Sequence, residues 1–77
     1  MLIMTPDGKT VFNLSNIMYL DVYGDNGSCT IYAYTDRQEY NLATYHTEER
    51  ALEVLDAIID GYRNERRFIH LPQRGGA

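Results

Sequence analysis

The chain has 77 residues, one cysteine and a formal net charge of −4 at pH 7. A chain of this length buries only about 60% of the surface that its unfolded form exposes, and a single cysteine, Cys29, excludes a disulfide within the chain. We therefore expect association with a second copy or a partner to bury further apolar surface. The acidic balance argues against a nucleic-acid polymer as that partner, because binding phosphates requires a basic patch.

Targeting signals are not evident in the sequence. The first residues lack a basic segment followed by a long apolar run, and no apolar stretch approaches the about 20 residues that span a bilayer. A lone cysteine is typical of a reducing compartment. We expect a cytoplasmic protein with no membrane attachment, in which residues 1–73 form one small domain and residues 74–77 a flexible tail.

The first half of the chain predicts short strands separated by turns. Residues 2–4 and about 10–14 read as short strands, the second with Phe12 and Leu14 on one side, and they flank a Thr5-Pro6-Asp7-Gly8 turn. The pair Ser15-Asn16 then breaks the alternation as a bulge or tight bend would. Three longer segments follow at residues 17–23, 28–35 and 39–45. The turn between the first two contains Asn26-Gly27, a strong signal for a β-hairpin.

Folding these segments as two hairpins with two-residue loops, at residues 26–27 and 36–37, tests the prediction. Residues opposite one another in a sheet share a face, and a slip of one residue would mix the two faces. The pairs expected are Val22–Ile31, Leu20–Ala33, Ile31–Leu42 and Ala33–Tyr40. The apolar side chains then fall on one face, which consists of Met18, Leu20, Val22, Ile31, Ala33 and Leu42.

A helix is predicted after the third long strand. Thr47 is a good N-cap, and Glu48 and Glu49 place negative charge in the first turn. Apolar residues recur at helical spacing, and the expected buried stripe consists of Ala51, Leu52, Leu55, Ile58, Ile59 and Tyr62, with Val54 at its edge. The chain therefore predicts an α+β fold: an antiparallel β-meander of four to five short strands, packed on one face by a single C-terminal amphipathic helix.

The segment after the helix is also apolar. Phe68, Ile69 and Leu71 lie close together and precede Pro72. We expect a short edge strand here, added to this subunit or to a neighbour, and we expect these three residues to form oligomer contacts.

No motif in the sequence points to an enzyme, a cofactor or a metal. His46 precedes the predicted helix and has Glu49 nearby, but a metal site needs further ligands that the sequence does not group there. Cys29 falls on the predicted core face, where a cysteine is usually inert. An enzyme that uses His46 therefore ranks last among the hypotheses, and no residue is expected to be catalytic or to bind metal.

The tyrosines are the most distinctive feature. Four of the seven project from the face opposite the helix in the predicted register: Tyr19, Tyr23, Tyr32 and Tyr34. Tyrosine favours strands and tolerates half-exposed positions, so an ordinary surface is one interpretation. A binding surface is the other, because tyrosine supplies apolar area, a hydroxyl group and little rotamer entropy.

Two segments of the sequence carry a resemblance to known proteins that covers most of the chain. They are the Asp7-Gly8-Lys9 turn and the stretch from Tyr45 to Leu55, which reads Tyr-His-Thr-Glu-Glu-Arg-Ala-Leu-Glu-Val-Leu. The chain resembles short uncharacterised proteins of Gram-positive bacteria and their prophages. The resemblance implies an abbreviated pleckstrin-homology-like sheet capped by a C-terminal helix. It implies no catalytic residue.

Two functions remain as hypotheses beside the enzyme. The first is a non-catalytic interaction module of bacterial or phage origin that works as a homo-oligomer through the four tyrosines and the 68–71 segment. The alternative is a phage anti-defence protein that sequesters a signalling nucleotide or blocks a host defence protein. Tyrosine rings would stack on bases, and arginines would contact the ligand phosphate or the partner. The candidate arginines are Arg37, Arg63, Arg66 and Arg67.

Overall fold

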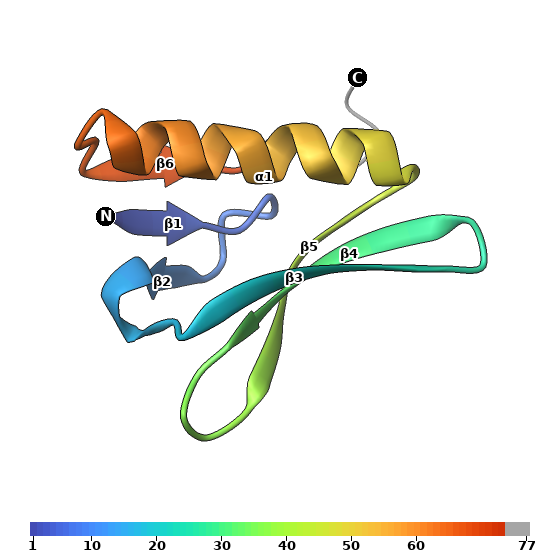
Figure 1. The fold of residues 1–77 in the computed structure, drawn as a ribbon, viewed down its shortest axis with the longest axis horizontal. Coiled ribbons are helices and arrows are strands. Elements are labelled where there is room, and N and C mark those ends of the chain that lie inside the picture. Colours follow the sequence, from blue (N-terminus) through green and yellow to red (C-terminus); the bar gives the residue numbers. More distant parts are fainter. Residues whose placement is uncertain (74–77) are drawn as a thin grey trace.

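The computed structural model describes residues 1–73 and places them in six strands, a short 3-10 helix and one α-helix (Figure 1). The tail expected at residues 74–77 lies outside the described residues. The elements are β1 (Leu2–Met4), β2 (Val11–Asn13), η1 (Leu14–Asn16), β3 (Tyr19–Asp25), β4 (Ser28–Tyr34), β5 (Glu39–Tyr45), α1 (Glu48–Arg63) and β6 (Phe68–His70). Within residues 1–73, no helix is both long enough and apolar enough to cross a membrane.

The strands form two three-stranded sheets that share one helix. Strands β3, β4 and β5 form an antiparallel meander in that order, and α1 packs against all three. Strand β1 lies between β2, to which it is antiparallel, and β6, to which it is parallel. The predicted α+β class is therefore confirmed. The meander itself has three strands, because the first two strands leave it to build the second sheet with β6.

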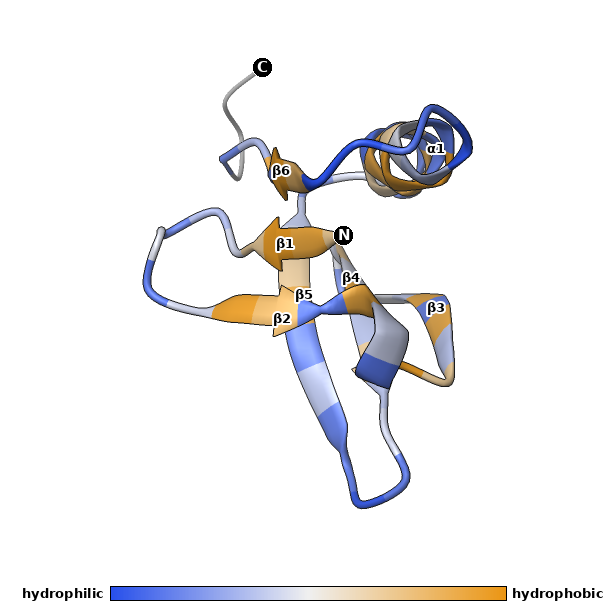
Figure 2. Ribbon diagram, turned by 90° about the vertical axis from the view of Figure 1, so that its left-hand side faces the viewer, coloured by the Kyte–Doolittle hydropathy of each residue, from blue (hydrophilic) through white to orange (hydrophobic). Residues whose placement is uncertain are grey.

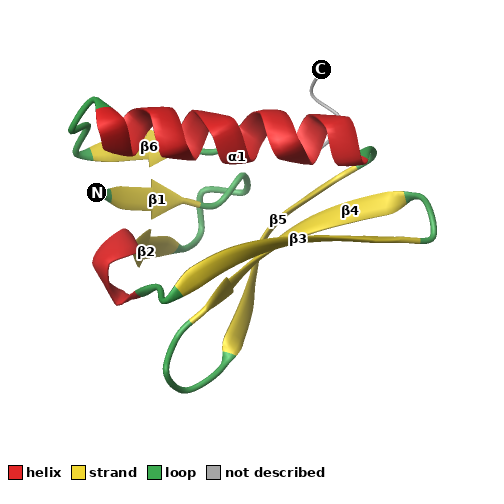
Figure 3. Ribbon diagram, in the orientation of Figure 1, coloured by secondary structure: helices red, strands yellow, loops and turns green. Residues whose placement is uncertain are grey.

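Both hairpin turns of the N-terminal half follow the sequence prediction. The Gly8 N–H donates to the Thr5 carbonyl at 2.9 Å, which closes the first turn. Asn26 and Gly27 have φ of 44° and 81°, the two positive values that a two-residue hairpin loop requires. The break after β2 is the 3-10 helix η1, drawn as the short red turn between β2 and β3 in Figure 3.

The predicted register of the meander is confirmed in the first hairpin, whereas the observed register shifts by one residue within the second. Val22 pairs with Ile31, and Leu20 pairs with Ala33, as expected. Ala33 pairs with Tyr40, but Ile31 pairs with Ala43 rather than with Leu42. Leu42 is the extra residue of a β-bulge. The bulge buries both Leu42 and Ala43 and turns the rest of β5 over.

Tyr45 enters the core because of this bulge. Alternation alone places its side chain on the face away from the helix, whereas it is fully buried, and its hydroxyl group donates to the Pro72 carbonyl at 2.9 Å. The phenol thus ties the end of the meander to the segment that follows β6. Burial raises the pKa of Tyr45 to about 12, although Arg50 nearby lowers it.

The C-terminal apolar segment completes the second sheet. Ile69 packs against the core from β6, and Leu71 is only 1% exposed. These two residues are therefore used within the chain, and of the three expected oligomer contacts only Phe68 stays exposed. Figure 2 shows β1 and β6 as hydrophobic neighbours and the β4–β5 turn as hydrophilic.

The end of α1 is closed by backbone hydrogen bonds. The Arg66 N–H donates to the Gly61 carbonyl at 2.9 Å, and the Glu65 N–H donates to the Tyr62 carbonyl at 3.1 Å. This is the pattern of a Schellman cap, in which glycine is the usual residue at the left-handed position. Here that position is Glu65, with φ of 55°. The chain therefore carries local strain at the turn from α1 to β6.

Glu65→Gly is expected to raise the free energy of unfolding by about 0.5–1 kcal/mol, because glycine relieves the left-handed strain and loses part of that gain in unfolded-state entropy. Urea unfolding followed by circular dichroism measures the change. Glu65→Ala is the matched control, since it removes the carboxylate and keeps the strained backbone. An equal gain in the alanine variant would contradict the explanation.

Tyr45→Phe is expected to lower the free energy of unfolding by about 1 kcal/mol, because the Pro72 carbonyl loses its donor. The phenol also makes stability depend on pH. Its pKa is raised in the folded state, so its contribution is complete below pH 10 and is lost as the pH rises toward 12. Urea midpoints of both proteins at pH 8 and at pH 11 test this: the loss over that interval should be smaller in the phenylalanine variant.

Candidate functional site

The tyrosine face consists of Tyr19, Tyr23, Tyr32 and Tyr34, on the outer side of the meander. Tyr19 pairs with Tyr34 and Asp21 pairs with Tyr32 across β3 and β4. Leu20 and Val22, the alternate residues of β3, pack against the core on the other side. The four tyrosines therefore project away from the core, as the first hairpin predicts.

The tyrosine rings form a partly stacked row. The Tyr19 and Tyr34 ring centroids lie 4.4 Å apart with 14° between their planes, and the Tyr32 and Tyr34 centroids lie 6.4 Å apart. Tyr23 stands beyond this row and is 60% exposed. Desolvation, and then the Glu39 carboxylate, raise the pKa of Tyr34. The Tyr34 phenol therefore remains a hydrogen-bond donor at neutral pH, on a face that also carries carboxylates.

The helix presents a second exposed apolar surface, which sequence reasoning missed. The buried residues of α1 are Ala51, Val54, Ile58 and Gly61. Four further apolar residues lie along one side of that stripe, and we call them the helix flank: Leu52, Leu55, Ile59 and Tyr62. All but the half-buried Leu55 are exposed.

The predicted stripe was therefore wrong in its orientation around the helix. It placed Leu52, Ile59 and Tyr62 in the core and Val54 at the edge, whereas Val54 is buried and those three are exposed. Small residues explain the difference. A Cβ on Gly61 would lie 3.4 Å from the Met1 sulfur, so the Met1 side chain packs closely against the helix at a position that carries no side chain. The apolar residues of α1 cover about half of the helix circumference, which is wider than one buried stripe. That width is the signal in the sequence that the helix has an exposed apolar surface beside its buried one.

The helix flank lies on the side of α1 that faces the β3 edge. Arg50 lies on the other side of the buried stripe, and its guanidinium carbon is 6.0 Å from the centre of the Tyr45 ring in β5. Strands β3 and β5 are the two edges of the meander. The flank opposite Arg50 is therefore turned toward β3, and Figure 1 shows α1 running alongside that strand.

Strand β3 is an open edge of seven residues. It pairs with β4 on one side, and no other described strand pairs with it. Its sequence, from Tyr19 to Asp25, contains no lysine, arginine or proline. Lysine and proline are among the commonest devices that prevent an edge from pairing with another chain, and the charged residues that β3 does carry are Asp21 and Asp25. Met18, which sequence analysis placed on the core face, lies just before β3 and is 69% exposed.

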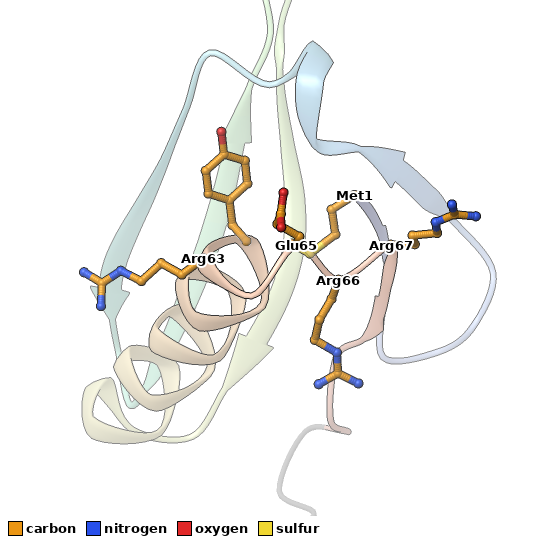
Figure 4. A pocket seen from close by; sticks show the side chains of 6 residues that line it. Met1, Arg63, Glu65, Arg66 and Arg67 are labelled. Carbon is orange, nitrogen blue, oxygen red and sulfur yellow. The ribbon is translucent and has the colours of Figure 1, made fainter.

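The predicted arginines do not converge on one point. Arg63, Arg66 and Arg67 line an open hollow of about 640 Å³ at the C-terminal end of α1, together with Met1, Tyr62 and Glu65. Figure 4 shows the three guanidinium groups pointing in different directions, with the Glu65 carboxylate among them. Arg37 lies in the β4–β5 turn, at the bottom of Figure 1, whereas α1 lies at the top.

The other candidate groups lie apart from one another. Cys29 is buried, and burial raises the pKa of its thiol, which suits a packing role. His46 is exposed just before α1 and His70 is exposed in β6. Among residues 1–73, no group of three or more His, Cys, Asp or Glu side chains is arranged to hold a metal ion.

Comparison with known proteins gives no further guide. No protein-family model matches the chain, and no curated protein or solved structure matches it either. The surface around β3 is therefore interpreted from its own geometry.

Ile58→Ala is expected to lower the free energy of unfolding by about 2–5 kcal/mol, because it leaves a cavity beneath the helix. The neighbouring Ile59→Ala is expected to lower it by less than about 1 kcal/mol, because Ile58 is 2% exposed and Ile59 is 42% exposed. Urea unfolding of the two variants at low protein concentration makes the comparison. Equal losses of unfolding free energy would show that Ile59 is buried and that the helix flank is not an exposed surface.

Proposed function

We propose that the chain is a non-catalytic interaction module that acts as a homo-oligomer. One observation carries this proposal: apolar surface is exposed on both sides of the open β3 edge. Tyr19 and Tyr23 lie on the outer side of the edge, and Ile59 and Tyr62 lie on the helix side. Contiguous apolar patches on small proteins commonly mark interaction sites.

The residue types at this surface fit a protein interface better than a solvated one. Tyrosine is enriched at interfaces and among residues that contribute most to binding. It buries a large ring with little loss of rotamer entropy, and its hydroxyl group keeps a hydrogen bond when the ring is covered. The surface offers such rings beside branched aliphatic side chains on the helix flank, which is the composition of an interface core.

Association would also add buried apolar surface to a chain that is too short to form a large hydrophobic core. The fully buried side chains form one cluster of modest size around Ile3, Ile31 and Tyr45. Covering the surface around β3 would remove further apolar area from water, at about 25 cal/mol per Å². The same surface in water contributes nothing to stability, so self-association is the economical use of it.

The alternative, a phage anti-defence protein that sequesters a signalling nucleotide or blocks a host defence protein, receives less support from the arginines. A nucleotide site needs cationic groups that converge on a phosphate near an aromatic platform. Arg63, Arg66 and Arg67 diverge around Glu65, and Arg37 is in another part of the fold. The geometry therefore favours self-association.

Light scattering coupled to size-exclusion chromatography tests the proposal over about a hundredfold range of protein concentration. We expect a mass at high concentration of at least twice the 8.9 kDa of the single chain. Tyr19→Ser/Tyr23→Ser should shift this mass toward that of the monomer. Val11→Ser, at an exposed apolar position of the other sheet, is the control and should leave it unchanged.

A monomer at every concentration would refute the proposal. A thermal-shift screen with cyclic nucleotides then decides the alternative, since ligand binding to the folded state raises the melting temperature. Stabilisation of a monomer by a nucleotide would favour the sequestering function.

A further inference from the structure

We propose that two copies of this chain pair through their β3 edges, antiparallel and in one register, with Val22 opposite Val22 of the second copy. This inference rests on the proposed function and names the partner surface and its register. The product would be a continuous six-stranded sheet with one helix of each copy on the same face. The free backbone groups of β3, its charges and the charges at the helix ends all favour this pairing.

Strand β3 has free backbone groups on the side away from β4. Asp25 pairs with Ser28 across the two-residue turn, and in such a hairpin this closing pair is hydrogen-bonded. Hydrogen-bonded and non-hydrogen-bonded pairs alternate along an antiparallel ladder. The backbone N–H and C=O groups of Leu20, Val22 and Gly24 therefore point away from β4 and are available to another strand.

The carboxylates of β3 limit the registers in which two copies can pair. Antiparallel pairing with Val22 at the centre uses all seven residues and places Tyr19 opposite Asp25 and Asp21 opposite Tyr23. Each carboxylate then faces a phenol that can donate to it. A shift that centres the pairing on Asp21 sets two carboxylates opposite each other, and one centred on Tyr23 sets Asp21 opposite Asp25. Like charges directly opposite destabilise a sheet, so the acidic residues of β3 disfavour these two shifts. Shifts that centre the pairing on Leu20 or Gly24 also keep the carboxylates apart, but they pair fewer residues of β3, so the Val22-centred register is favoured by charge and by length together.

The helices of the two copies also complement each other. A two-fold axis through the joined strands brings the helix flanks of the two copies toward each other in antiparallel directions, because α1 runs alongside β3 (Figure 1). The N-terminal end of α1 carries Glu48 and Glu49, and its C-terminal end carries Arg63, with Arg66 in the turn that follows. The acidic end of one helix then faces the basic end of the other. A second copy of this chain therefore complements the surface around β3 in three ways: it extends the sheet, it covers apolar side chains, and it places opposite charges at the helix ends.

Cysteine cross-linking tests the register. In the proposed pairing, residue 21 of one copy lies opposite residue 23 of the other, with Cα atoms about 4.5 Å apart, which is within disulfide reach. Two residues 21 would be about 8 Å apart, which is beyond it. Asp21→Cys and Tyr23→Cys are purified separately and oxidised with diamide, alone and as an equal mixture. The parent chain, whose Cys29 is buried, is the control.

We expect the mixture to give a covalent heterodimer, identified by mass spectrometry, and each variant alone to give far less covalent dimer. Faster cross-linking of either variant with itself would overturn the register. A dimer by light scattering with no cross-link in any sample would overturn the β3 interface while leaving the homo-oligomer intact. A monomer by light scattering would instead refute the proposed function, so the two failures are distinguishable.

A pair of charge variants provides a second measurement. Asp21→Lys/Tyr23→Lys places lysine opposite lysine in the proposed register, and we expect it to raise the dimer dissociation constant by at least about tenfold. Glu53→Lys/Ala57→Lys makes the same change in net charge at exposed positions on the side of the helix away from the helix flank. We expect this control to dimerise like the parent chain. Equal weakening in both variants would attribute the effect to net charge and would contradict the interface.

Discussion

The packing of α1 against the two sheets is the constraint on which the rest of the structure depends. The helix has an apolar arc of about half its circumference, but the sheets beneath it cover only part of that arc. Ala51 and Gly61 allow a close approach, and Val54 and Ile58 fill the space between them. Because the smaller side chains face the sheets, the larger side chains of the helix flank lie outside the core. The candidate interaction surface is thus a direct result of how the core is packed.

Local features of the sequence predicted the elements well, because each depends on neighbouring residues. Asn26-Gly27 determined the turn and register of the β3–β4 hairpin, and Thr47 determined where α1 begins, its hydroxyl oxygen accepting from the Arg50 N–H at 3.0 Å. The tyrosine face followed from that hairpin alone. These features specify φ angles and short-range hydrogen bonds, which two or three residue types can encode.

The features that the sequence did not predict depend on residues far apart in the chain. The parallel pairing of β1 with β6 joins Ile3 to Ile69, and no local pattern marks it. The bulge at Leu42 arises because β5 must bury Leu42, Ala43 and Tyr45 together, while alternation would bury only the first. The orientation of the buried stripe on α1 likewise depends on Met1, which lies against Gly61 although the two residues are far apart in the chain. Tertiary packing decided each of these against the local pattern.

The open β3 edge is the feature on which the proposed function rests. A seven-residue edge without lysine, proline or bulge is a hazard for a small protein, because it offers backbone groups to any extended chain. Strand β3 instead carries carboxylates at Asp21 and Asp25, both on its tyrosine side. Carboxylates at two positions do not prevent the edge from pairing with another strand. They destabilise every register that sets one carboxylate opposite another. Together with the helix flank and the tyrosine face, they give the edge the selectivity that the proposed pairing of two copies requires.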